Sequence, residues 1–299
     1  MSYVAVTIQH QRSEHIAAKA IRDSYCGLVK SRPTWLARLL RDDSLIEVYY
    51  VNCGGMPIDD VGLARLRTFS GLQTLSLDDA TVTDAGLSNL EGLTQLEWLS
   101  LNGAAVTDAG IVHLRGLRKL RYLDLVATNV TDAGLAYLAD LRELRILGLS
   151  ETGITDAGLV HLRGMDNLEE LVINGTAITD AGISHLGQLS HLRALQVDNT
   201  RVTDVGLAHL ERLVGLKELS LTSTRIGDDG LAHIGRLSKL ECLHLCNTKI
   251  TDAGLLHLRG LSKLKLIWLY RTEVTDQGVK RLQQSLPNCK LVTGESPVE

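Results

Sequence analysis

The sequence predicts an α/β solenoid in which ten copies of one 24-residue unit stack along residues 48–287. The thirteenth residue of the unit is Asp and the fifteenth is Gly in all ten copies. Within each unit, apolar residues at the fourth and sixth positions alternate as in a strand, and those at the sixteenth, nineteenth and mostly the twenty-second follow the spacing of a short helix or 3₁₀ segment. The chain also has 56 leucines against 11 aromatic residues. One such unit cannot bury its leucines alone, whereas stacked units share one core.

The copies begin at Val48, Leu72, Leu96, Leu120, Leu144, Leu168, Leu192, Leu216, Leu240 and Leu264. A Thr-Asp pair precedes the helical part in eight of them, and both residues are good N-cap candidates because their side-chain oxygens accept from free backbone N–H groups. We expect the glycine two residues later to allow close approach of neighbouring backbones. A ladder of calcium ions is the alternative for the ten aspartates, but their spacing matches no calcium-binding loop, so capping is the preferred interpretation.

The unit, written LxxLxLxxTxVTDAGLxxLxxLxx, resembles the leucine-rich repeat, in the T-D-A-G-L variety of bacterial, planctomycete-like proteins that is related to the cysteine-containing class. The resemblance covers residues 48–287 and implies a right-handed horseshoe with a parallel sheet on the concave face and short helices on the convex face. It also implies that the ninth residue bonds backbone groups between coils. That position is Thr in seven copies and Met56, Ala80 and Ala104 in the first three.

Both ends are expected to be caps. Residues 1–47 are predicted to form an N-terminal helical cap, with an amphipathic helix over 33–40 that carries Pro33 in its first turn and a second helix over 16–21. Residues 288–299 are predicted to form a C-terminal cap and tail. We expect the segment 286–291 to break the repeat register and close the core.

Composition argues against several classes of protein. The net charge of −4 disfavours a general nucleic-acid binder, and the apolar runs are too short for a membrane span. The first ten residues do not form a cleavable secretory signal, and five cysteines without a CxxC pair favour a reducing, cytoplasmic compartment. There is no P-loop, H-E-x-x-H, G-x-S-x-G or G-x-G-x-x-G motif, so neither enzymatic activity nor a cofactor is expected.

Two groups of residues could carry metal chemistry. Six histidines share the eighteenth position, namely His113, His161, His185, His209, His233 and His257. A metal array is possible in principle, but Arg65, Asn89, Tyr137 and Arg281 fill the same position, which favours a consensus position of the outer helix. If the last five stack, burial and mutual repulsion should lower their pKa values. Cys242, His244 and Cys246 alternate along one strand, where we prefer surface thiols to a metal site.

Specificity is expected at the third, fifth and seventh positions, whose side chains face solvent on the inner, concave side of the predicted sheet. These 30 positions hold five of the 11 aromatic residues and five acids, but no Lys or Arg. This pattern suits a protein or peptide partner of basic character. The candidate partner-binding residues are Tyr50, Asp78, Trp98, Tyr122, Asp124, Glu170, Asp198, Glu218, His244, Trp268 and Tyr270.

The sequence therefore predicts a non-enzymatic recognition scaffold that binds a protein or peptide on its concave sheet. The alternative is a substrate-receptor subunit of a ubiquitin ligase, because similar eukaryotic repeats are often joined to an F-box. That alternative requires an adaptor-binding helical domain among residues 1–47.

Overall fold

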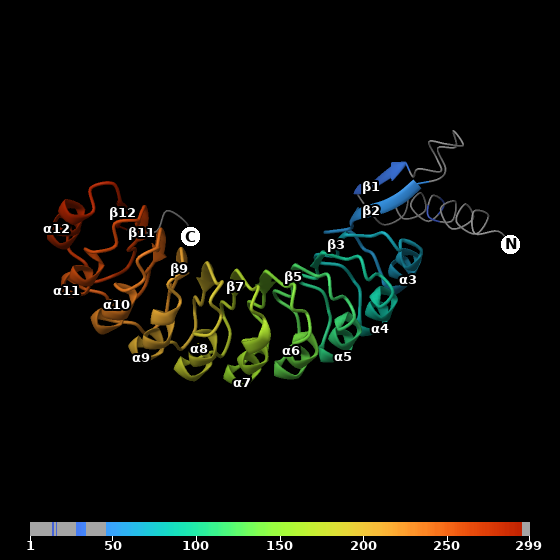
Figure 1. Ribbon diagram of the computed structural model, residues 1–299, viewed down its shortest axis with the longest axis horizontal. Coiled ribbons are helices and arrows are strands. Elements are labelled where there is room, and N and C mark those ends of the chain that lie inside the picture. Colours follow the sequence, from blue (N-terminus) through green and yellow to red (C-terminus); the bar gives the residue numbers. More distant parts are fainter. Residues whose placement is uncertain (1–13, 15, 17–27, 34–45, 295–299) are drawn as a thin grey trace. The chain divides into compact units, whose positions relative to one another are not determined.

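The computed structural model describes Glu14, Ile16 and residues 28–33 and 46–294. The chain divides into two compact units, Met1–Leu144 and Arg145–Glu299, which are described one at a time. Each is a stack of coils with a sheet along one side and short helices along the other (Figure 1). The alternation of strand and helix that the two apolar periods predict is thereby confirmed in both units.

The first unit contains five strands in the order β1-β2-β3-β4-β5. Its elements are β1 (Leu28–Pro33), β2 (Ile46–Asn52), α3 (Asp60–Ala64), η1 (Arg65–Thr68), β3 (Thr74–Ser76), α4 (Asp84–Leu87), η2 (Ser88–Leu90), β4 (Trp98–Ser100), α5 (Asp108–Ile111), η3 (Val112–Leu114), β5 (Tyr122–Asp124) and α6 (Asp132–Leu138). The η elements are 3₁₀ turns that follow a single α-helical turn.

The second unit contains seven strands in the order β6 to β12. Its elements are β6 (Ile146–Gly148), α7 (Asp156–Leu159), η4 (Val160–Gly164), β7 (Glu170–Val172), α8 (Asp180–Leu186), β8 (Ala194–Gln196), α9 (Asp204–Leu207), η5 (Ala208–Arg212), β9 (Glu218–Ser220), α10 (Asp228–Ile234), β10 (Cys242–His244), α11 (Asp252–Leu255), η6 (Leu256–Leu258), β11 (Leu266–Trp268), α12 (Asp276–Ser285) and β12 (Lys290–Val292).

Leucine fills the core of both units. From β3 to β11 the middle residue of each three-residue strand is Leu, or Ile267 in β11, and it has no exposed surface. These residues lie in register on neighbouring strands, as Leu219 does with Leu195 and Leu243. The residues on either side of them point away from the core, so the sheet presents the third, fifth and seventh residues of each unit on a surface that we call the sheet face.

The eighth residue of every repeat unit adopts a left-handed conformation, which the sequence pattern does not reveal. It is Gly55, Gly103 and Gly175 in three copies, and in the others it is Asp79, Ala127, Glu151, Asn199, Ser223, Asn247 and Arg271, with φ between 53° and 58°. The backbone N–H of Asn199 donates to the carbonyl of Thr222 in the next coil at 2.8 Å. The conformation thus turns the chain out of the strand while extending the hydrogen-bond ladder, at a cost of roughly 1–2 kcal/mol per non-glycine residue.

The ninth-position threonines bond within their own coil. The Thr128 hydroxyl donates to the carbonyl of Leu125 at 2.6 Å, and Thr200 makes the same bond to Val197 at 2.7 Å. The link between coils that the family resemblance implies for this position is therefore wrong here. The hydroxyl can still be buried because it satisfies a carbonyl of the turn that it closes.

The link between coils is made by the repeated aspartates instead. Asp84 Oδ1 accepts from the backbone N–H of Thr107 at 2.7 Å, and Oδ2 accepts from the Thr107 hydroxyl at 2.6 Å. The same pair of bonds joins Asp60–Thr83, Asp108–Thr131, Asp156–Thr179, Asp180–Thr203, Asp228–Thr251 and Asp252–Thr275. In each unit Asp is the first residue of the helix, and the N-cap residue before it is Thr except in α3, where it is Asp59, and α10, where it is Gly227. The prediction that the Thr-Asp pair caps the helix is confirmed for the threonine, whose hydroxyl accepts from the helix backbone in α5, α7 and α8. It is wrong for the repeated aspartates. Asp59, which takes the threonine's position in the first copy, caps α3.

The N-terminal end differs from the sequence prediction. Pro33 is the last residue of strand β1, which pairs with β2 in antiparallel orientation, so it does not begin a helix. The rest of the expected helix over 33–40 lies outside the described residues. Glu14 is buried against β2, where its Oε2 accepts from the Val48 N–H at 3.0 Å. Burial raises the pKa of the Glu14 carboxyl to about 7.

The C-terminal segment continues the repeat register. Strand β12 pairs with β11 in parallel, with Leu266 opposite Lys290, and this keeps the 24-residue spacing. The expected break in register is wrong. The three residues of β12 pair with the backbone of β11 along the edge that this strand would otherwise leave free. Leu286 and Cys289 are buried, so the segment covers the last leucines of the stack as expected.

The cysteines of the described residues differ in their bonding. Cys53 is disulfide-bonded, while Cys242, Cys246 and Cys289 are free. Within the part of the chain that the structure describes, no helix is long and apolar enough to cross a membrane.

Candidate functional site

The candidate binding residues fall into two groups, one on the sheet face of each unit. Tyr50, Asp78, Trp98, Tyr122 and Asp124 belong to the first unit, and Glu170, Asp198, Glu218, His244, Trp268 and Tyr270 belong to the second. All are half-buried except Glu218, which is exposed. Each group is a separate candidate surface.

In the first unit, two aromatic rings stack on neighbouring strands. The ring centroids of Trp98 and Tyr122 lie 4.6 Å apart with 12° between the planes. The Tyr122 hydroxyl donates to Asp124 Oδ2 at 3.4 Å, and Asp124 Oδ1 accepts from the Val126 N–H at 3.0 Å. Third-position residues on adjacent strands are therefore brought together, as the sequence predicts, and form a flat aromatic surface.

Tyr50 is already in contact with a cation. Strand β1 places Lys30 Nζ 4.5 Å from the centroid of the Tyr50 ring, a favourable cation–π distance. The ten repeat units contribute no Lys or Arg to the sheet face, but β1 adds one that the repeat pattern could not reveal. Asp78 is also engaged, since it accepts hydrogen bonds from the hydroxyls of Ser76 and Ser100.

In the second unit, three rings cluster at the ends of β10 and β11. His244 and Trp268 stack with centroids 5.8 Å apart, and the Tyr270 ring lies 5.6 Å from Trp268 at a tilt of 46°. The indole Nε1 of Trp268 is buried and has no hydrogen-bond partner among the described residues. Burial lowers the pKa of His244, while the charges of Asp198 and Glu218 oppose that shift.

Asp198, in the middle of this sheet, is hydrogen-bonded to two residues of the following coil. Its Oδ1 accepts from the Ser220 hydroxyl at 2.6 Å and from the Thr222 N–H at 2.8 Å. Burial nevertheless raises the pKa of Asp198, because the hydrogen bonds and the nearby His244 offset only part of the cost of desolvation. A small pocket of ≈ 120 Å³ lies between Asp198, Glu218 and His244.

Glu170 and Glu218 differ from the aspartates because neither carboxylate has a hydrogen-bond or ion-pair partner in the described part of the chain. They occupy the same position on β7 and β9, with Ala194 of β8 between them. Two strand spacings separate the two residues by about 10 Å at the backbone. Burial and the charge of Glu218 raise the pKa of Glu170.

The thiol and imidazole groups of β10 lie close together. Cys242 Sγ is 3.3 Å from His244 Nε2. Burial raises the pKa of both Cys242 and Cys246, which disfavours the reactive thiolate form. No group of three or more potential ligands within the described residues has the geometry of a metal site.

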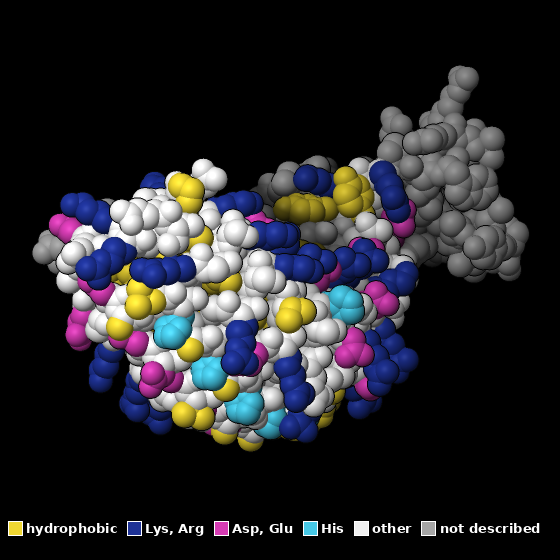
Figure 2. Space-filling view, turned by 60° about the vertical axis from the view of Figure 1, so that its left-hand side comes forward, with side chains coloured by type: hydrophobic (Ala, Val, Ile, Leu, Met, Phe, Trp, Pro, Cys, Tyr) yellow, Lys and Arg dark blue, Asp and Glu magenta, His cyan; other side chains and the backbone are white. Residues whose placement is uncertain are grey.

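The repeated histidines lie on the helix side. Figure 2 shows histidine side chains following one another in a row on the outer surface. His233 Nδ1 lies 2.5 Å from Glu211 Oε1, and His113 Nδ1 lies 2.6 Å from Glu91 Oε1. Burial and the charge of Arg163 lower the pKa of His185. The expected lowering of the pKa is thus confirmed for His185, where the charge that contributes to it is that of Arg163 and not of a neighbouring histidine.

Together, the stacked coils and the ladder between them define a leucine-rich repeat solenoid of the α/β class. A leucine-rich repeat family model matches residues 116–139 and 216–235. An internalin from Listeria monocytogenes is similar in structure, with a TM-score of 0.54 and 21% identity over 88% of this chain and 94% of the internalin. Internalin C2 of the same organism has a TM-score of 0.57 and 26% identity over 70% of this chain and 81% of its own.

A search of curated proteins found no relative with significant sequence similarity. The comparisons therefore support the leucine-rich repeat fold.

Proposed function

We propose that this protein is a non-enzymatic recognition scaffold that binds a basic segment of a protein or peptide partner on the sheet face of its second unit. The observation that carries the proposal is the pair Glu170 and Glu218, two carboxylates without a partner among the described residues on either side of the small Ala194. A Lys or Arg side chain of the partner would lie over Ala194 and pair with both carboxylates. Its positive charge would offset the repulsion between Glu170 and Glu218.

The aromatic cluster supplies the second element of the proposal. His244, Trp268 and Tyr270 lie one to two strands beyond Glu218 and expose apolar ring surface beside the acidic pair. Aromatic anchors next to charged groups are typical of the residues that dominate protein–protein binding energies. The Trp98–Tyr122 stack is a second candidate surface, on the first unit.

A labelled hexa-arginine peptide is a suitable probe, with hexa-citrulline as its uncharged control. The double substitution Glu170→Gln and Glu218→Gln is expected to weaken binding of hexa-arginine at least tenfold in fluorescence anisotropy, because two charge-assisted hydrogen bonds are lost. The matched control is Glu151→Gln with Glu273→Gln, which removes the same charge from exposed positions outside the sheet face.

Equal losses in the two double variants would show that the peptide responds only to net charge, and the proposed site would be wrong. Binding should also weaken as the pH falls through a range above that of an ordinary glutamate, because the raised pKa of Glu170 allows it to be protonated earlier. No observation on the described residues favours the ubiquitin-ligase alternative.

A further inference from the structure

Three cations lie in a row along one lateral side of the second unit. Arg201, Arg225 and Lys249 occupy the tenth position of consecutive repeat units, between the end of each strand and the helix that follows. None of the three has an acidic partner in the part of the chain that the structure describes. Like charges on successive coils repel, so this row is electrostatically unsatisfied.

Elsewhere in the same unit, stacked cations are neutralised. Glu169 lies between Arg145 and Arg193, with N···O distances of 3.1 and 3.7 Å. Glu241 lies in the same way between Lys217 and Lys265. At the second position of the repeat, each glutamate therefore pairs with the cations of both neighbouring coils. The tenth position, by contrast, places two guanidinium groups on consecutive coils without an ion-pair partner among the described residues.

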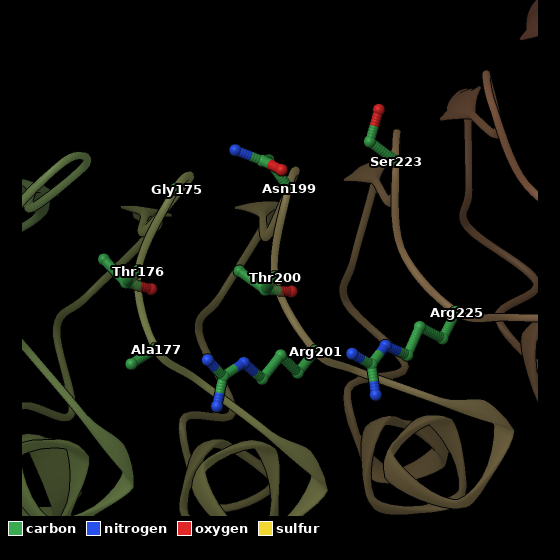
Figure 3. A pocket seen from close by; sticks show the side chains of 8 residues that line it. All are labelled: Gly175, Thr176, Ala177, Asn199, Thr200, Arg201, Ser223 and Arg225. Atoms are coloured by element: carbon green, nitrogen blue, oxygen red, sulfur yellow. The ribbon is translucent and has the colours of Figure 1, made fainter.

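A pocket of ≈ 460 Å³ opens beside the two arginines, within the size range of small-molecule sites. Figure 3 shows Arg201 and Arg225 both extending toward the preceding coil, while Asn199 and Ser223 stand at the opposite end of the set of lining side chains. Ala177, one coil before Arg201, has too short a side chain to fill the space.

The polar groups of the pocket have different capacities to bind a ligand. The hydroxyl of Thr200 already donates to Val197, and that of Thr176 donates to Ile173. The Ser223 hydroxyl oxygen accepts from Asn247 Nδ2 at 3.0 Å, which leaves its own O–H as a donor. The available donors are therefore two guanidinium groups at one end and a hydroxyl and an amide at the other. No aromatic or large apolar side chain lines the pocket.

We propose that this pocket binds a phosphoryl group between Arg201 and Arg225. Planar guanidinium groups bind phosphate oxygens through paired hydrogen bonds, and a doubly charged anion neutralises both arginines at once. The Asn199 and Ser223 end of the pocket suits the hydroxyl groups of a polar ligand body, while a nucleobase would find no ring on which to stack. The ligand is either free phosphate or the phosphate of a small polyhydroxylated molecule.

Isothermal titration calorimetry of the full chain at low ionic strength can test the site with four titrants: inorganic phosphate, glucose 6-phosphate, AMP and unphosphorylated glucose. Wild type is expected to bind phosphate and glucose 6-phosphate, but not unphosphorylated glucose. The double substitution Arg201→Gln and Arg225→Gln should weaken binding at least tenfold, since both charge-assisted contacts are removed. The control Arg212→Gln with Arg259→Gln removes the same charge from exposed positions of the helix side and should leave the affinity unchanged.

The outcomes distinguish the two sources of phosphate. Tighter binding of glucose 6-phosphate than of phosphate identifies a phosphorylated polyol as the ligand, and equal binding identifies free phosphate. The proposal is overturned if neither probe binds at millimolar concentration, if AMP binds more tightly than both, or if the Arg201→Gln, Arg225→Gln variant binds as wild type does. Thermal unfolding of the variant, expected to match wild type because both side chains are exposed, verifies that the fold is intact.

Discussion

At the scale of single residues, the fifteenth position of the repeat is glycine because of a carboxylate in the preceding coil. A Cβ atom built on Gly206 would lie within 3 Å of Asp180 Oδ1, and the same clash recurs at Gly86, Gly110, Gly182, Gly230 and Gly254. That carboxylate is held in place by Thr203, so it cannot move aside without losing its hydrogen bonds. The two residues of the repeat thus depend on each other, because the absence of a Cβ atom at the glycine leaves space for the aspartate of the preceding coil.

The substitution Gly206→Ala is therefore expected to destabilise the protein by about 1–3 kcal/mol, the usual cost of overpacking. Urea unfolding would measure the loss. Gly260→Ala is the control, because nothing lies within 4 Å of a Cβ at that position. Removing the obstacle with Asp180→Ala should make the cost of Gly206→Ala smaller, and additive effects of the two substitutions would show that the carboxylate is not the cause.

The sequence shows that Asp and Gly are invariant within the repeat but not why. Each aspartate and its threonine partner are 23 residues apart, so their contact exists only once coils have stacked. A Thr-Asp pair before a helix is also a good local cap, and this plausible local role conceals the long-range one. The sequence pattern also does not point to Arg201 and Arg225, because they lie outside the strand positions, at which specificity is expected in a repeat of this kind.

At the scale of elements, the aspartate ladder joins the start of each helix to the start of the next. Asp252, at the first residue of α11, accepts from the hydroxyl and the N–H of Thr275, which caps α12. These hydrogen bonds lower the pKa of Asp252 below its ordinary value of 3.8. Because the folded state then binds its proton less tightly than the unfolded state, this stabilisation is complete above pH 3.8 and is lost as the pH falls through the folded pKa.

The substitution Asp252→Asn should accordingly destabilise the protein most at neutral pH, and the difference from wild type should shrink as the pH falls below about 4. Urea midpoints between pH 6 and pH 3 would measure this. Asp276→Asn is the control, because no further repeat unit follows α12 to supply a threonine. A difference that stays constant across the whole pH range would mean that the ionised form of Asp252 is not what holds the two helices together.

The repeat pattern does not predict the strands at the two ends of the sheet, β1 and β12. The sequence does not indicate β1, because Pro33 favours the first turn of a helix and the chain before Val48 carries no repeat from which to infer a strand. Once formed, β1 covers the edge that β2 would otherwise expose, and β12 does the same for β11. Lys30 reaches Tyr50 only through this added strand, so one candidate anchor could not be evaluated from the repeats alone.

At the scale of the whole molecule, stability is built from contacts between neighbouring coils. Each strand of the second unit pairs only with the strands of adjacent coils, from β6 to β12. Stability in such a stack is approximately a sum of unit terms and nearest-neighbour terms. A substitution that destabilises one coil should therefore lower the stability of the adjacent coils more than that of distant ones.

Leu219→Asp tests this expectation. Leu219 has no exposed surface and lies in register with Leu195 and Leu243, so an aspartate there buries an unpaired charge and should cost several kcal/mol. Hydrogen exchange is expected to show the greatest loss of protection in β8, β9 and β10, and retained protection in the first unit. Glu218→Asp, at the exposed neighbouring residue, should leave the exchange pattern of wild type. Equal loss of protection from β2 through β12 would instead show that the coils unfold as one cooperative body, and that nearest-neighbour contacts do not limit the spread of damage.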